Sequence, residues 1–154
     1  MSDPMDVYSK PVKTEKHKLC TQYFMVPRAD PRKPGRELLV TYDDRFPFVE
    51  GFVAHYSYLV RFFEEGNFAG NHYHEKKHEL FVPVVGEFTI DLEHIETKER
   101  ESVGVRSDEN SVLYIHPLVA HKVTTKTKNG VLLVIATSPN SDEDEYKYEV
   151  GKIG

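Results

Sequence analysis

Histidine and glutamate residues are concentrated in the segment 66–86, which has the sequence "GNFAGNHYHEKKHELFVPVVG". His72 and His74 are two residues apart, and Glu79 opens the apolar run that follows a short polar bend at 75–77. Side chains alternate between the two faces of a β-strand, so His72 and His74 project to the same side, about 6.6 Å apart. Glu79 can face the same space from the returning strand. The spacing therefore predicts three polar side chains around one point.

His121 is the fourth candidate. It begins another predicted strand far along the chain, and in a closed barrel its imidazole would meet the other three side chains. Three imidazoles and one carboxylate suit a divalent transition metal such as Fe, Mn, Ni, Co or Zn, with positions left open for a substrate. The predicted metal ligands are thus His72, His74, Glu79 and His121. The alternative interpretation is a solvated cluster of surface histidines on a polar turn.

Five further residues are candidates for the same pocket or for its neighbourhood. Tyr114 is a candidate proton donor. Arg61 interrupts an otherwise apolar strand, and it is either an inward anchor for an anion or an outward arginine at the edge of the sheet. Tyr58 and Phe81 fit the barrel core, and they are also the aromatic candidates for substrate binding. His78 is adjacent to Glu79, which makes it either a competing ligand or a residue of the outer face.

Length and composition predict one acidic globular domain. The 154 residues suit a single core, and 39% hydrophobic residues exclude wholesale disorder. A net charge of −5 argues against nucleic-acid binding. No apolar stretch approaches the roughly 20 residues that span a bilayer, and the first 18 residues lack the apolar core of a signal peptide, so we expect a cytoplasmic protein. Cys20 is the single cysteine and is interpreted as a small core hydrophobe.

The remaining sequence consists of short apolar runs separated by turns, without sustained helical periodicity. This pattern predicts an all-β sandwich or barrel. Besides the histidine segment, the predicted strands are 37–42, 52–63, 79–85, 87–95, 101–106, 111–116, 121–127 and 131–138. Asn129-Gly130 predicts a hairpin with a type I′ turn between the last two runs. We expect residues 1–36 to form an N-terminal arm and loop, 37–138 the barrel, and 139–154 a solvated acidic tail.

The histidine segment fits the pattern G-x5-H-x-H-x4-E-x6-G at every fixed position, and this pattern resembles the first motif of the cupin superfamily. The fixed positions are Gly66, His72, His74, Glu79 and Gly86. The resemblance covers roughly residues 37–138, and it implies a cupin of the RmlC-like group, a jelly-roll-type β-barrel. It also favours the metal-site interpretation over the surface cluster. Isolated cupins of this size usually pair, so the resemblance implies a homodimer.

The second cupin motif, G-x5-P-x-G-x2-H-x3-N, is matched only in part. His121 supplies its histidine. Asn110 stands at the first glycine, and asparagine tolerates a left-handed backbone. His116, Leu118 and Thr125 replace the proline, the second glycine and the asparagine. The leucine implies a turn of different shape.

A narrower resemblance is to the sugar-nucleotide 3,4-ketoisomerases of the WxcM-like group. It rests on "GRELLVTYDDRFPF", "LYIHPLVAHKV" and "VLLVIATSPNSDEDEY", which ends in an acidic stretch similar to that of the family. The resemblance implies proton transfer next to a sugar ketone, with His72 as the acid/base group and no requirement for a metal. Histidine suits this role because its pKa lies near neutral pH.

Three positions depart from the ketoisomerase pattern and leave the function open. Ala69 and Pro34 stand where the family usually has arginines, which weakens the case for a diphosphate-bearing substrate. Glu79 stands where glutamine is common, which strengthens the case for a metal. We therefore expect a metal-binding isomerase or epimerase of a sugar or nucleotide-sugar ketone, with His72 and His74 as catalytic residues. The alternatives are an Fe- or Mn-dependent dioxygenase and a cupin that binds a small molecule without turnover.

Overall fold

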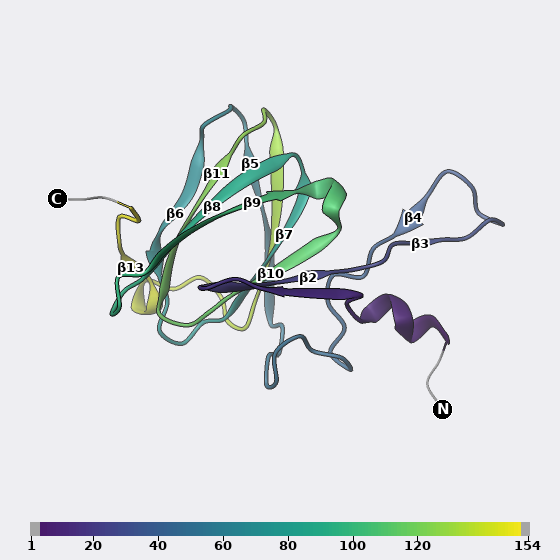
Figure 1. The fold of residues 1–154 in the computed structure, drawn as a ribbon, viewed down its shortest axis with the longest axis horizontal. Coiled ribbons are helices and arrows are strands. Elements are labelled where there is room, and N and C mark those ends of the chain that lie inside the picture. The colour runs from purple at the N-terminus through teal and green to yellow at the C-terminus, as the bar shows by residue number, and fades with distance from the viewer. Residues whose placement is uncertain (1–3, 152–154) are drawn as a thin grey trace.

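The computed structural model describes residues 4–151, and nearly all of its regular structure is β (Figure 1). Two antiparallel sheets face each other. The six-stranded sheet has the order β1 (Lys13–Lys16), β2 (Cys20–Phe24), β10 (Ser111–Ile115), β7 (Glu79–Val85), β12 (Gly130–Ala136), β5 (Tyr56–Phe62). The five-stranded sheet has the order β13 (Tyr146–Lys147), β6 (Phe68–Tyr73), β11 (Val119–Thr125), β8 (Glu87–His94), β9 (Arg100–Arg106). The prediction of an all-β fold is confirmed.

The main core lies between the two sheets and is made by side chains that face inward from the strands of both sheets. Phe81, Phe88, Leu113 and Leu132 are among its buried members. Each strand contributes every second side chain to this layer, as the period of a β-strand requires. The burial of apolar surface in this layer is the main stabilising contribution to the sandwich.

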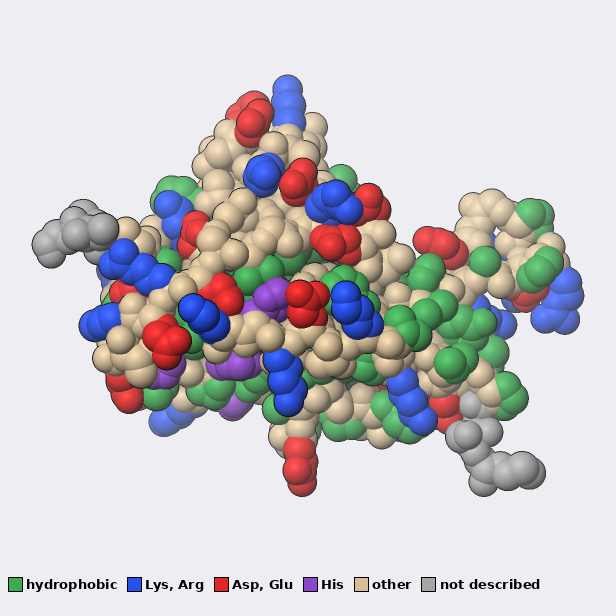
Figure 2. Space-filling view, viewed as in Figure 1, with side chains coloured by type: hydrophobic (Ala, Val, Ile, Leu, Met, Phe, Trp, Pro, Cys, Tyr) green, Lys and Arg blue, Asp and Glu red, His purple; other side chains and the backbone are tan. Residues whose placement is uncertain are grey.

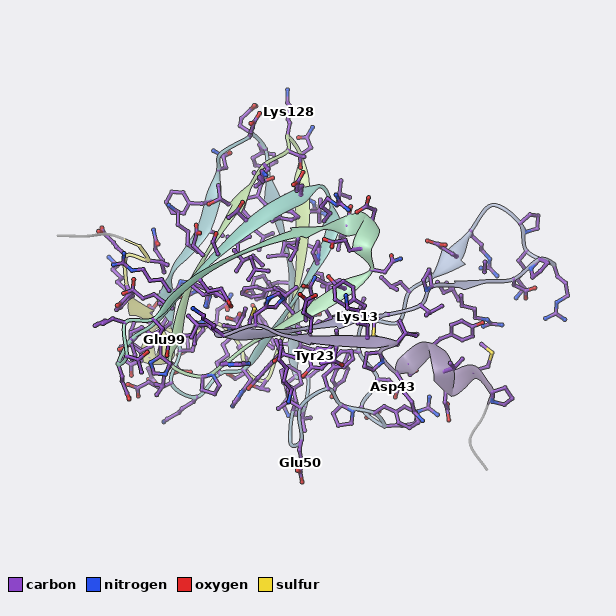
Figure 3. The ribbon with its side chains drawn as sticks, viewed as in Figure 1. Lys13, Tyr23, Asp43, Glu50, Glu99 and Lys128 are labelled. Atoms are coloured by element: carbon purple, nitrogen blue, oxygen red, sulfur yellow. The ribbon has the colours of Figure 1, made fainter. Side chains whose placement is uncertain are left out.

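A second, smaller core covers the outer face of the six-stranded sheet. Residues of the loop 39–55, which precedes β5, pack there on Leu80 and on other outward side chains of the sheet; Tyr42, Phe48 and Phe52 are among them. Tyr23 of β2, labelled in Figure 3, stacks on Phe48 with ring centroids 4.6 Å apart. The six-stranded sheet is therefore apolar on both faces over part of its area.

Most of the predicted strands are present with closely similar bounds, and the run 37–42 is the exception. Only Glu37–Leu38 form a strand there, β4, which pairs with β3 (Arg28–Ala29). This two-stranded ribbon projects away from the sandwich (Figure 1). The following residues Leu39 and Tyr42 pack on the outer core instead of pairing with a strand.

The hairpin predicted at Asn129-Gly130 is wrong. Strand β11 belongs to the five-stranded sheet and β12 to the six-stranded sheet, so the connection crosses between layers. Asn129 has the left-handed φ of 59°, but Gly130 is absent from the positive-φ residues, whereas a type I′ turn needs both. A Cβ on Gly130 would lie 2.6 Å from Thr125 Oγ1 and 3.1 Å from the ring of Phe88, so close packing is what requires glycine there.

The segments on either side of the predicted barrel also contribute strands. Within the N-terminal segment, β2 pairs with β10 over five residues and β1 pairs with β2. Within the C-terminal segment, β13 pairs with β6. The part of the chain that the structure describes also contains three short 3₁₀ helices: η1 (Pro4–Ser9), η2 (Ser107–Glu109) and η3 (Asp142–Asp144).

Charged side chains lie mainly at the surface and at the ends of loops. Acidic and basic groups are interspersed on the face seen in Figure 2. Glu50, Glu99 and Lys128, labelled in Figure 3, occupy loops and are exposed. Among residues 4–151, no helix is long and apolar enough to cross a membrane.

Candidate functional site

The four predicted ligands come from three strands and meet in the space between the two sheets. His72 lies in β6 and His74 directly follows it, Glu79 is the first residue of β7, and His121 lies in β11. His72 and His121 are paired in register. The ring centroids of His72 and His74 are 4.9 Å apart, and those of His72 and His121 are 4.7 Å apart. The prediction that these side chains face one space is confirmed.

An irregularity in β6 brings its backbone close to β11 beside the histidines. Gly70 has a φ of 107° and Asn71 a φ of 62°, and the register between the two strands shifts at the same place. A Cβ on Gly70 would lie 2.5 Å from the carbonyl oxygen of His121, which is too close for any other residue. Gly70 therefore permits the strand spacing that places His72 opposite His121.

Glu79 is the centre of the cluster. Its Oε1 lies 3.1 Å from His74 Nε2 and 3.5 Å from His121 Nε2. Its Oε2 accepts a hydrogen bond of 3.3 Å from the hydroxyl of Tyr58. The side chains of His74, Glu79 and His121 are only 4–6% exposed, whereas that of His72 is 23% exposed. The first three residues thus form a buried group, and His72 stands at its accessible side.

A cavity of about 40 Å³ adjoins this cluster. His72, Glu79, His121, Tyr58 and Phe81 are among the residues that line it. The ring of Phe81 meets that of His121 edge-on, with centroids 5.3 Å apart. The prediction that Tyr58 and Phe81 reach the pocket is thus in agreement with their positions.

Burial and mutual charge set the protonation of the cluster. Burial alone would raise the pKa of Glu79, but pairing with His74, together with His121 and a nearby lysine, lowers it to about 2. Burial would lower the pKa of His74, and pairing with Glu79 more than offsets this, so the pKa of His74 is raised. Burial, followed by the charges of His121 and His74, lowers the pKa of His72 to about 4. At neutral pH the cluster therefore combines an ionised carboxylate with a neutral His72.

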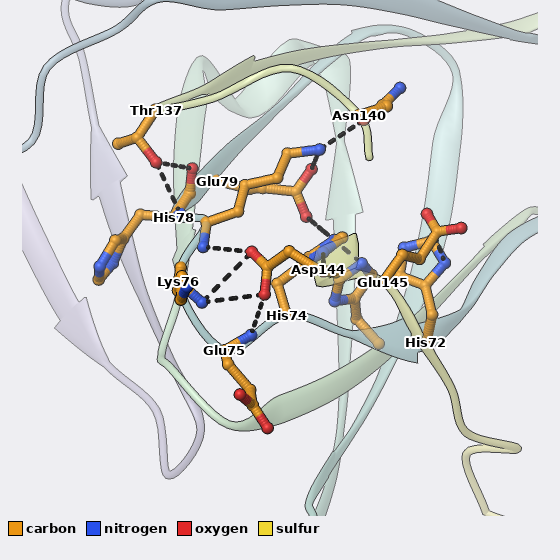
Figure 4. A network of polar contacts seen from close by, with 12 residues as sticks. His72, His74, Glu75, Lys76, His78, Glu79, Thr137, Asn140, Asp144 and Glu145 are labelled. Carbon is orange, nitrogen blue, oxygen red and sulfur yellow. Dashed lines mark hydrogen bonds and ion pairs between the residues drawn. The ribbon is translucent and has the colours of Figure 1, made fainter. Parts of the chain in front are cut away.

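The acidic C-terminal segment closes over this cluster instead of extending into solvent (Figure 4). The carboxylate of Asp144 accepts hydrogen bonds from the backbone N–H groups of residues 75–77. The backbone oxygen of Asp144 lies 2.7 Å from His74 Nδ1, and Glu145 Oε1 lies 3.5 Å from His72 Nδ1. Most side chains of this segment are exposed, as expected, but Asp144 and Glu145 contact the rings of His74 and His72.

Two predicted site residues lie elsewhere. Arg61 is exposed on the outer face of β5, because the strand alternates and Tyr58 and Val60 take the inward positions. Tyr114 points to the outer core, with its hydroxyl 2.8 Å from His78 Nδ1. The prediction of Tyr114 as a proton donor and of Arg61 as an inward anchor is therefore not supported by the geometry. His78 contacts Tyr114 and is not part of the cluster, in line with its expected outer position.

Two groups that contact the cluster did not stand out in the sequence. Lys77 is buried beside Glu79, and the Asp144–Glu145 pair comes from the tail. Lys77 lies in a polar bend, where lysine normally reaches solvent. The sequence of the bend therefore does not indicate that Lys77 is buried. The only indication for the tail was that its acidic stretch is similar to the ending of the ketoisomerase sequences.

Comparison with known proteins shows a family match that covers most of the chain. The family model described as "Polysaccharide biosynthesis C-terminal domain" matches residues 42–146. No curated protein matches the sequence.

Solved structures with the same fold include two 3,4-ketoisomerases and an epimerase. A variant of the 3,4-ketoisomerase QdtA from Thermoanaerobacterium thermosaccharolyticum, in complex with TDP-4-keto-6-deoxyglucose, is 21% identical, with a TM-score of 0.65 over 86% of this chain and 89% of its own. A 3,4-ketoisomerase from Helicobacter canadensis is 15% identical, with a TM-score of 0.70 over 85% and 92%. The rmlC epimerase from Mycobacterium tuberculosis is 13% identical, with a TM-score of 0.73 over 88% and 72%. The predicted RmlC-like cupin fold is confirmed.

Proposed function

The chain belongs to the polysaccharide biosynthesis C-terminal domain family, and on this premise we propose that it is an isomerase or epimerase of a sugar-nucleotide ketone. The observation that carries the proposal is a neutral imidazole, His72, which lines a cavity beside a buried carboxylate and a phenol. Proteins of the same fold include a 3,4-ketoisomerase solved in complex with TDP-4-keto-6-deoxyglucose and an enzyme described as a 4-keto-6-deoxy sugar epimerase. The cavity of about 40 Å³ takes only the reacting part of such a substrate, so the nucleotide would lie outside it.

In the proposed reaction, His72 accepts a proton from the carbon next to the ketone carbonyl, and the electrons of that C–H bond form an enolate. A proton returned to the other face of the same carbon gives an epimer. A proton delivered to the former carbonyl carbon, with transfer of the neighbouring hydroxyl proton to the former carbonyl oxygen, gives the isomeric ketone. A base with a pKa below the working pH is present in its accepting form at neutral pH. Glu145, beside His72 Nδ1, would stabilise the imidazolium.

Tyr58 is the proposed partner of His72 in this transfer. Burial, followed by the charge of Glu79, raises the pKa of the Tyr58 hydroxyl. The phenol therefore stays protonated and can donate to an oxygen on the substrate. In the structure it donates instead to Glu79 Oε2, which holds it at the edge of the cavity. Tyr58 thus takes the role that the sequence had suggested for Tyr114.

The buried part of the cluster fits a divalent transition metal. Within residues 4–151, His74 Nε2 and Glu79 Oε1 are buried and, apart from their mutual contact at 3.1 Å, have no hydrogen-bond partner. His72, His74 and His121 can place one nitrogen each within 4.8 Å of one another. We assign His74, Glu79 and His121 as ligands, because Glu79 contacts both of these histidines. His72 is left for proton transfer, or it is the fourth ligand. A bound ion would polarise the carbonyl oxygen of the substrate.

The test uses TDP-4-keto-6-deoxyglucose in D₂O with the protein as purified and after incubation with each metal. We expect solvent deuterium at a carbon next to the ketone, detected by NMR. His72→Gln should reduce this incorporation at least about 100-fold, the usual range for loss of an acid/base group. His55→Gln, at an exposed histidine, should leave it unchanged. Iron-dependent uptake of oxygen without deuterium incorporation would instead indicate the dioxygenase.

Elemental analysis of the same variants separates the two roles of His72. Glu79→Gln should lose the metal, because it removes the anionic ligand. If His72→Gln retains the metal but loses exchange, His72 is the proton acceptor. If His72→Gln also loses the metal, His72 is the fourth ligand. Absence of deuterium incorporation under every metal condition would overturn the proposed function.

A further inference from the structure

Lys77 is a buried lysine next to the proposed metal ligands. Its side chain is 2% exposed, whereas lysine is almost never fully buried unless it is paired. Removing an ammonium group from water costs several kcal/mol, which only well-placed partners offset. The position of Lys77 therefore calls for an explanation in terms of what it contacts.

The contacts of Lys77 converge on Glu79. Its Nζ lies 3.7 Å from Glu79 Oε2, donates a hydrogen bond to Asn140 Oδ1, and lies 5.8 Å from the ring centroid of Tyr58. The two carboxylate oxygens of Glu79 therefore have different partners. Oε2 faces Lys77 and the hydroxyl of Tyr58, and Oε1 faces the two buried imidazoles, His74 and His121.

We propose that Lys77 is a positioning residue of the metal centre. It holds Oε2 of Glu79, with the help of Asn140, so that Oε1 is presented to the ion together with the nitrogens of His74 and His121. Groups that orient a ligand in this way are a regular part of metal sites. Lys77 acts through Glu79 and does not touch the substrate. The inference rests on the proposed function, because it assumes that Glu79 is a ligand.

The neighbouring Lys76 provides a matched control. The backbone N–H groups of Lys76 and Lys77 both donate to the carboxylate of Asp144, and Figure 4 shows Lys76 within this network. The side chain of Lys76 is exposed. The two residues thus share the same bend and the same backbone anchor, and they differ in whether the ammonium group meets Glu79.

The experiment compares Lys77→Met and Lys76→Met with the wild type. Methionine keeps most of the length of the side chain and removes the charge. The affinity for Zn²⁺ is measured by competition with a chromogenic chelator, and circular dichroism and the melting temperature check the fold. We expect Lys77→Met to bind Zn²⁺ about 10- to 100-fold more weakly, the usual effect of losing a group that orients a ligand. Lys76→Met should bind as the wild type does.

Equal or tighter binding by a folded Lys77→Met would overturn the inference, because it would mean that the ammonium group only repels the ion. If the wild type binds no Zn²⁺, Mn²⁺, Co²⁺, Ni²⁺ or Fe²⁺, the proposed ligand set is wrong, and the isomerase activity is tested separately by deuterium exchange. Lys77 is then judged by deuterium exchange. A lower kcat at unchanged KM in Lys77→Met supports positioning of Glu79 within the cluster, and unchanged exchange overturns it.

Discussion

Two residues with a left-handed backbone directly precede strands β10 and β11. Asn110, before β10, has a φ of 56°, and Leu118, before β11, has a φ of 62°. Both stand where the second cupin motif has glycine. Both positions therefore have a left-handed backbone without glycine, and the expectation that Leu118 implies a turn of different shape stays a prediction. A non-glycine residue in this conformation costs about 1–2 kcal/mol, and asparagine tolerates it best.

Leu118→Gly should therefore stabilise the protein. The gain from relieved backbone strain is offset by the greater freedom of glycine in the unfolded chain, about 0.4–1 kcal/mol, and by the loss of a half-buried side chain. We expect a net increase of up to about 1 kcal/mol in the free energy of unfolding, measured by urea denaturation. Asn110→Gly is the control and should change little. A clearly less stable Leu118→Gly would mean that packing of the leucine outweighs the strain.

At the scale of elements, the site depends on how closely β6 approaches β11. The register shift and the glycine at position 70 let the two backbones come together where His72 and His121 face each other. Because side chains alternate along each strand, the intervening residues point outward. The cluster is thus a product of strand spacing as much as of the histidines.

Gly70→Ala should disturb this spacing. The added Cβ would lie 2.5 Å from His121 O and 3.1 Å from the Cα of Lys122, both backbone atoms that cannot turn away. These contacts, together with the φ of 107°, should reduce the stability by at least about 1–3 kcal/mol. We also expect weaker metal binding. The measurements are chemical denaturation and chelator competition.

Gly104→Ala in β9 is the matched control for this change. A Cβ at Gly104 meets nothing within 4 Å, and alanine in a strand interior is favoured over glycine by roughly 0.5–1 kcal/mol. The control should be neutral or stabilising and should leave metal binding unchanged. If Gly70→Ala behaves as Gly104→Ala does, the close approach of β6 and β11 is not required.

At the scale of the whole molecule, the C-terminal segment ties the five-stranded sheet to the site. Strand β13 pairs with β6, and Tyr146 stacks on Tyr73 with ring centroids 5.0 Å apart. The hydroxyl of Tyr148 donates to Glu93 of β8, whose other oxygen pairs with Arg100 at 2.6 Å. Docking of the tail should therefore depend on the charge of Glu93.

Acid should release the tail. Burial would raise the pKa of Glu93, but the hydrogen bonds from Tyr148 and Arg100 lower it below its ordinary value. A carboxyl whose pKa is lower in the folded state stabilises fully above its unfolded pKa of about 4.3, and this contribution is lost as the pH falls through the folded value. We expect amide-exchange protection at 146–148 to decrease below about pH 4.

Glu93→Gln tests the cause of this loss. The variant should already have reduced protection at pH 7, because the charged interaction with Arg100 is gone, and it should change less than the wild type as the pH falls. Hydrogen exchange detected by mass spectrometry measures both. Equal acid sensitivity in the two proteins would place the titrating group elsewhere in the tail.

The strands that carry the site, and the four residues that meet in it, could be predicted from the sequence alone. Period-2 alternation brought His72 and His74 to one side, and the bounds of β7, β8 and β10 follow from apolar runs between turns. These features depend on neighbours in the chain, which is why local pattern predicts them. The cupin spacing then supplied the long-range partner, His121.

The groups that contact the cluster from other segments could be identified only in the folded chain. The tail reaches His72 and His74, Lys77 is buried against Glu79, and Tyr114 turns to the opposite face of its sheet. A polar residue shows the same local pattern whether it meets solvent or another polar group. The choice depends on which segments pack over it, and packing between distant segments is a property of the folded chain.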